Sequence, residues 1–188
     1  KVIIASLGYL SYKQGDALGL FSINDKSASL YPTRVQKMYS NFLYQLLQIN
    51  AEGKWPDNLE SFELIHQPNE KGLIVVVSDM HQEADEIIDV VKRLKTDLNE
   101  VIFLQIISEN EMNLEYGGVV TLEDLETGQT LKVNSKDVGK EYRKTINLHL
   151  ETIKEELLDY GILWHKFMVG EPLSETLAAF IKSRKQLL

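Results

Sequence analysis

The spacing of apolar residues in the first third of the chain predicts helices around a pair of short strands. Residues 2–13 carry apolar side chains at helical spacing, and Gln14-Gly15 ends that segment. Two apolar segments follow, residues 16–23 and 27–31, with the turn signal Asn24-Asp25 between them. We expect these two strands to pair with each other.

The middle of the chain alternates helical patterns with continuous apolar runs. Pro32-Thr33 is predicted to start a helix with a wide apolar face, and residues 58–66 a short helix. Residues 72–77, GLIVVV, are apolar on both faces, which indicates the centre of a parallel sheet covered by helices on both sides. Residues 82–94 are predicted to be a helix and residues 100–108 another buried strand.

The pattern changes after this second buried strand. Residues 119–125 and 130–133 flank a turn containing Gly128 and predict a β-hairpin. Residues 138–160 form the longest helical pattern, with Gly161 as its C-cap, and residues 162–169 a further strand. Pro172 is predicted to open the last helix. The fold class is therefore a three-layer α/β domain, with a mostly parallel sheet, helices on both faces and an inserted hairpin.

Composition narrows the class of partner. The 188 residues contain 44% apolar and 26% charged residues, which suits one globular domain over residues 1–188. The formal net charge of −8 argues against binding to nucleic acid or to an anionic membrane surface. We find no apolar run near the roughly 20 residues that a spanning helix needs, so no membrane insertion is expected. There is no cysteine, which excludes disulfides and thiolate metal sites and fits the reducing cytoplasm.

The common catalytic motifs of α/β enzymes do not occur in the sequence. There is no G-x-S-x-G elbow, no G-x-x-x-x-G-K-[ST] phosphate loop and no G-x-G-x-x-G turn. The acidic pairs Glu109 with Glu111 and Asp85 with Glu86 are interpreted as solvated surface, because acid–base work needs a pocket that separates their pKa values. We therefore expect no enzymatic activity and no cofactor.

The histidines do not form a metal-binding pattern. His66, His81, His149 and His165 include no pair at the i, i+4 spacing of a metal-binding helix. We interpret them as ordinary surface or core histidines. His81 differs from the others because it closely follows Asp79 at the end of a predicted strand.

Ser78-Asp79 ends the most apolar strand and has two interpretations. Ligands of open α/β sheets bind outside the carboxyl ends of the strands, which is where this pair is expected to lie. Alternatively, Asp79 caps the helix that follows it. The sequence leaves both interpretations open.

Four segments carry a resemblance to a known family. They are Gln14-Gly15-Asp16-Ala17-Leu18-Gly19-Leu20-Phe21, Lys71-Gly72-Leu73-Ile74-Val75-Val76-Val77-Ser78-Asp79, Leu122-Glu123-Asp124-Leu125-Glu126-Thr127-Gly128 and Glu171-Pro172-Leu173. In their order and spacing they resemble the von Willebrand factor A-like, Rossmann-like domain of the bacterial proteins called domain of unknown function family 58. The resemblance implies that the first strand of that fold is missing here. We therefore interpret the chain, which starts at Lys1 without a methionine, as an N-terminally truncated segment of a longer polypeptide.

The resemblance also bears on metal binding. Von Willebrand A domains hold a divalent ion with a D-x-S-x-S loop, a threonine on a later loop and an aspartate after the central strand. Only Asp79 matches this pattern. The D-x-S-x-S loop would precede Lys1, and the threonine loop corresponds to Trp55-Pro56-Asp57-Asn58, which contains no threonine. One carboxylate cannot complete the octahedral oxygen shell of Mg²⁺, so we predict no bound metal.

The resemblance implies a role in protein–protein interaction. We predict a partner-binding surface made by Asp57, Asn58, Ser78, Asp79 and His81. The expected partner is another protein, and the resemblance points to a MoxR-type AAA+ ATPase that assembles or matures other proteins. A second copy of the chain, which would fill the gap left by the missing strand, is a further candidate. The alternative function is a metal-assisted hydrolase with its site near Asp79.

Overall fold

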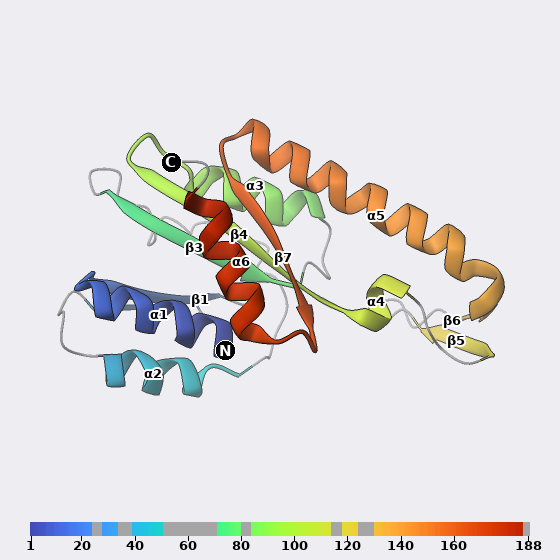
Figure 1. Cartoon of the computed structure of the whole chain (residues 1–188), viewed down its shortest axis with the longest axis horizontal. Helices are drawn as coiled ribbons and strands as arrows, with labels where there is room; N and C mark the ends of the chain where they lie inside the picture. Colours follow the sequence, from blue (N-terminus) through green and yellow to red (C-terminus); the bar gives the residue numbers. More distant parts are fainter. Residues whose placement is uncertain are drawn as a thin grey trace. The chain divides into compact units, whose positions relative to one another are not determined.

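The computed structural model describes residues 1–23, 28–33, 39–50, 71–79, 84–113, 118–123 and 130–185 (Figure 1). They belong to two compact units, Lys1–Glu70 and Lys71–Leu188. The prediction of one domain with a missing first strand stays a prediction. The predicted helix over residues 58–66 lies outside the described residues.

The first unit begins with the predicted helix and strand pair. Helix α1 (Val2–Gln14) ends at Gly15, whose φ of 83° is the left-handed conformation that glycine adopts most readily. Strand β1 (Leu18–Ile23) pairs antiparallel with β2 (Ala28–Thr33), which confirms the predicted pairing. The prediction that Pro32-Thr33 opens a helix is wrong, because both residues belong to β2. Proline is tolerated there because, in the described sheet, β2 pairs with β1 alone.

Helix α2 (Tyr39–Gln48) packs on α1 and β1 to form the core of this unit. Among the described residues, the buried apolar side chains of this core are Leu20, Phe42 and Leu46. Gly8 lets α1 and α2 approach closely, since a Cβ at that position would lie 2.5 Å from Cε1 of Phe42. The hydroxyl of Tyr39 donates a hydrogen bond of 2.9 Å to the carbonyl of Ala5, so the contact between α2 and α1 includes a hydrogen bond as well as apolar packing.

The second unit is built on a parallel sheet of three strands. Its order is β3 (Gly72–Ser78), β4 (Asn99–Ser108) and β7 (Leu163–Val169). The prediction that residues 72–77 form the centre is wrong for this sheet, because β4 is the middle strand. Residues Val101 to Gln105 of β4 are all buried, whereas Leu73 of β3 is 44% exposed. A middle strand is covered along both edges as well as both faces, which explains the difference.

Helices cover both faces of this sheet (Figure 1). Helices α3 (Ala84–Leu94) and α5 (Ser135–Asp159) pack on one face, where Leu150 joins a buried cluster with Ile107 of β4. Helix α6 (Leu173–Lys185) packs on the other face, where the ring of Phe180 contacts His165 and Phe167 of β7. The three-layer, Rossmann-like α/β class is thus confirmed.

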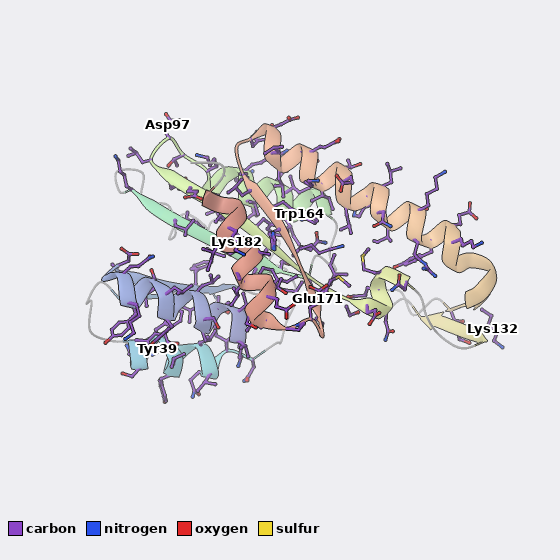
Figure 2. All side chains as sticks on the ribbon, in the orientation of Figure 1. Tyr39, Asp97, Lys132, Trp164, Glu171 and Lys182 are labelled. Atoms are coloured by element: carbon purple, nitrogen blue, oxygen red, sulfur yellow. The ribbon has the colours of Figure 1, made fainter. Side chains whose placement is uncertain are left out.

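Polar contacts join neighbouring strands of the sheet and the two helices that cover one of its faces. On the α5 face, the indole N–H of Trp164 donates to the side-chain oxygen of Gln105 at 2.9 Å, which satisfies the buried amide oxygen (Figure 2). Lys92 of α3 donates to Glu156 of α5 at 2.7 Å, and this bond raises the pKa of Lys92. The Lys92 ammonium also lies 4.3 Å from the ring centroid of Tyr160.

The inserted hairpin is present between the sheet strands β4 and β7. Strand β5 (Val119–Glu123) pairs antiparallel with β6 (Thr130–Asn134), and the turn with Gly128 lies outside the described residues. A short helix, α4 (Glu109–Asn113), precedes the hairpin and was not predicted. Helix α5 follows it and ends at Gly161 with φ 69°, as predicted. Over the part of the chain that the structure describes, no helix is both long and apolar enough to cross a membrane.

Candidate functional site

The carboxyl ends of β3, β4 and β7 lie on one side of the sheet, where α4 and α6 begin (Figure 1). Ser78, the last residue of β3, pairs with Gln105, whereas Ser108, the last residue of β4, pairs with Val169 of β7. The two other strands therefore extend three residues, about 10 Å, beyond β3. Because β3 is shorter at this end, Ser78 and Asp79 lie beside the last residues of β4 and β7, which project beyond them.

Asp79 lies at the position where α/β sheets bind ligands. Ser78 is partly buried and Asp79 is exposed. Helix α3 is described from Ala84 onward, after residues 80–83 that lie outside the described part. Both interpretations of Asp79, a ligand-binding residue and a helix cap, therefore stay predictions.

At the end of β4, Ser108 and Glu111 form a capping box for α4. The backbone N–H of Glu111 donates to Oγ of Ser108 at 3.3 Å, and the N–H of Ser108 donates to the Glu111 carboxylate. This reciprocal pair satisfies two backbone donors that a helix start leaves unpaired. Glu111 therefore has a structural role rather than the simple solvated one predicted for it. Glu109, its predicted companion, is exposed.

At the end of β7, a tight turn leads directly into α6. Gly170 adopts a φ of 102°, and the carbonyl of Pro172 accepts the backbone N–H groups of Glu175 and Thr176. The hydroxyl of Thr176 lies within hydrogen-bond distance of the Glu171 carboxylate at 3.4 Å. These bonds confirm that Pro172 opens the last helix, and they hold Glu171 at the start of it.

The remaining predicted site residues are not tested by the described structure. Asp57, Asn58 and His81 lie outside the described residues, so their places in the surface stay predictions. Asp85 and Glu86 belong to the first turn of α3. The sequence analysis did not identify Val169, which is 59% exposed at the carboxyl end of β7. Its place in an apolar strand pattern concealed that exposure.

The two histidines that the structure describes have the ordinary roles expected of them. His149 is exposed on α5. His165 is half-buried, with its ring 5.2 Å from that of Phe167 and 5.4 Å from that of Phe180. Burial lowers the pKa of His165 below its ordinary value of 6.5. Among the described residues, no group of three or more histidine, aspartate or glutamate side chains could hold a metal ion.

A comparison with known protein families decides the relationship that the motifs suggested. The family described as protein of unknown function DUF58 matches residues 1–152, which is most of the chain. The chain belongs to the DUF58 family. No curated protein matches it.

A solved structure supports the fold of this DUF58 chain independently. A crystal structure of the conserved hypothetical protein BatB from Bacteroides thetaiotaomicron matches with a TM-score of 0.55 at 14% identity, over 97% of this chain and 84% of that one. This similarity supports the α/β fold alone. An uncharacterized membrane spanning protein from Vibrio fischeri matches with a TM-score of 0.26 at 17% identity, over 99% of this chain and 84% of that one. A TM-score of that size supports no conclusion.

Proposed function

We propose that the chain is a protein-binding module whose contact surface lies at the carboxyl end of the parallel sheet. The supporting observation is the exposed Val169 at the tip of β7, in register with Ser108 at the tip of β4. The exposed acidic residue Glu109 directly follows the tip of β4, and the exposed Glu171 follows the tip of β7 after Gly170. An apolar side chain within a polar rim is the usual composition of a protein interface.

The residues of this surface define the chemistry of its partner. Asp79, Glu109 and Glu171 are exposed carboxylates at or beyond the three strand ends. A segment with lysine or arginine beside an apolar side chain would match them, because opposite charges on the rim speed association and exclude other partners. The first candidate is the MoxR-type AAA+ ATPase to which the family resemblance points.

The structure also bears on the alternative, a hydrolase using Asp79. Glu111 at the neighbouring strand end is held by its capping hydrogen bonds. Glu171 is likewise placed beside the hydroxyl of Thr176. The carboxylate of Glu111 therefore serves to cap α4, which supports the binding module over an enzyme that would use this group as its acid or base.

A binding assay with matched variants tests the proposal. We would immobilise a MoxR-type ATPase from the same organism and measure binding by biolayer interferometry. Val169→Asp is expected to weaken binding about tenfold or more, as loss of a central contact does, and Glu109→Lys to slow association several-fold.

The controls carry the same chemical changes at the opposite end of the sheet. Asp97, labelled in Figure 2, is exposed just before β4 begins. Leu98, the next residue, is also exposed. Leu98→Asp and Asp97→Lys are expected to leave binding unchanged. Equal losses in the test and control variants would show that the contact surface lies elsewhere.

A further inference from the structure

Helix α5 carries an exposed face with an ordered arrangement of charge. Its inner face is the predicted one, with Leu150, Ile153 and Leu157 buried against the rest of the second unit. Exposed residues recur on the outer side at three- and four-residue intervals, which places them along one stripe. In chain order this stripe consists of Lys140, Lys144, Leu148, Glu151 and Glu155. Figure 2 shows side chains projecting from α5 away from the sheet.

The middle of the stripe is apolar and strongly exposed. The side chain of Leu148 is 68% exposed, the highest value among the large apolar residues that the structure describes. Two lysines precede it and two glutamates follow it. The stripe therefore has a basic half, an apolar centre and an acidic half.

This order of charges is unfavourable within a single helix. Lys140 with Lys144 and Glu151 with Glu155 are like-charged pairs at i, i+4 spacing, which repel each other. The basic half lies nearer the N-terminus of α5 and the acidic half nearer its C-terminus.

Contacts within the chain offset little of this repulsion. Lys154 pairs with Glu151 at 2.9 Å, but both side chains are exposed, and such pairs stabilise little. Among the described residues, Lys140 and Lys144 form no ion pair. Among the side chains that the structure describes, the ion pairs therefore offset little of the repulsion along this stripe.

We propose that this face binds α5 of a second copy of the chain in antiparallel orientation. A two-fold axis passing between Asn147 and Leu148 would place Lys144 opposite the partner's Glu151 and Lys140 opposite the partner's Glu155. Symmetry repeats both pairs, because the same patch serves each copy. Leu148 would pack beside the partner's Leu148 at the centre.

The antiparallel arrangement offsets this repulsion. Each like-charged pair then faces a pair of opposite charge, and the two helix dipoles run in opposite directions. The stripe from Lys140 to Glu155 is about 22 Å long, at about 1.5 Å per residue. A single pair of helices of this length buries less than a standard interface, so the dimer is expected to be weak, with a dissociation constant on the order of micromolar.

This inference does not depend on the proposed function. The stripe lies on α5 and shares no residue with the surface at the carboxyl end of the sheet. Failure of either proposal would therefore leave the other untouched.

Sedimentation equilibrium of two charge-reversal variants, separately and mixed, tests the dimer. The first variant carries Lys140→Glu with Lys144→Glu, which makes the stripe wholly acidic. The second carries Glu151→Lys with Glu155→Lys, which makes it wholly basic. Each variant alone is expected to self-associate about tenfold or more weakly than the unchanged chain, because every proposed charge pair becomes repulsive.

The mixture of the two variants is the decisive sample. In the mixed dimer all four charge pairs are again opposite, so association is expected to return to the strength of the unchanged chain. Its recovery would also show that both variants fold. Raising the salt concentration is expected to weaken the unchanged dimer and the mixed dimer alike.

Three results would overturn the proposal. The first is an unchanged chain that stays monomeric at low salt up to about 0.5 mM, well above a micromolar dissociation constant. The second is a dimer unaffected by either charge reversal. The third is a mixture that associates no better than its components, provided that circular dichroism shows both variants to be folded.

Discussion

Replacing Gly8 with alanine should destabilise the first unit, although alanine is the better helix former. Gly8 is buried within α1, where α1 meets α2. A Cβ there would lie 2.5 Å from Cε1 and 2.9 Å from Cζ of Phe42. The Phe42 ring is 3% exposed, so it has little room to move away. The added methyl group therefore forces either the ring or the two helices to shift.

The magnitude follows from two opposing effects. Glycine-to-alanine replacement in a helix interior is favourable by about 1 kcal/mol. Adding a methyl group to a well-packed core costs about 1–3 kcal/mol. The ring must retreat by roughly 1 Å to reach an ordinary contact distance, which places the cost in the middle of that range. We expect a net loss of about 1 kcal/mol.

Gly139 provides the matched control. It is buried within α5, and a Cβ added there would have the carbonyl oxygen of Asn113 as its nearest neighbour at 3.8 Å, an ordinary contact. Gly139→Ala should therefore be neutral or stabilising by up to about 1 kcal/mol, since the helix preference acts without a clash.

Hydrogen exchange measures the two effects where they occur. Exchange of the amides of β1 and α2 reports the local free energy of opening for the first unit, and exchange in α5 reports it for the control. Phe42→Leu should cost less in the Gly8→Ala background than in the unchanged chain, because the smaller side chain relieves the clash. If Gly8→Ala slowed exchange as Gly139→Ala does, the close packing of Gly8 on Phe42 would be refuted.

Three further predictions concern the second unit. Ser108→Ala should destabilise α4 by about 1 kcal/mol, measured by exchange of its amides, because the capping bond to the Glu111 N–H is lost. The pKa of His165 is lower in the folded chain than in the unfolded chain, so the unfolded chain binds a proton more readily. The contribution of His165 to the free energy of unfolding should therefore be full at pH values above 6.5. It should decline as the pH falls from 6.5 to the lower pKa of the folded state. His165→Phe should abolish that decline in urea titrations at different pH values, and an unaltered pH profile would contradict this assignment. Calorimetric titration with Mg²⁺ should show no tight binding, whereas stoichiometric binding lost in Asp79→Ala would overturn the expectation of no metal.

The spacing of hydrophobic residues was sufficient to predict most helices and strands, and to predict which side of each helix is buried. Ile87, Ile88, Val91 and Leu94 of α3 are buried as their spacing predicts. Helix periodicity is a local property, so it can be recognised without knowing what the helix packs against. The same reasoning explains why the ends of α1 and α5 were predicted correctly from glycines.

The candidate site was only partly predictable from the sequence. The position of Ser78-Asp79 at a strand end followed from the apolar run before it. The capping box of Ser108 and Glu111 was not predicted, because an S-x-x-E spacing has this meaning only where a helix starts. Helix α4 is only five residues long, too short for a periodic pattern to reveal it.

Strand order and the exposure of single side chains were decided by tertiary structure. The apolar runs of β3 and β4 look equally central in sequence, and their order depends on which strands pair through hydrogen bonds between distant segments. Val169 is apolar like the rest of β7, yet it is exposed because the strand ends there beside a turn. Leu148 is likewise exposed on α5. A sequence records the preference of each residue for burial, whereas the packing of neighbouring elements determines whether that preference is met.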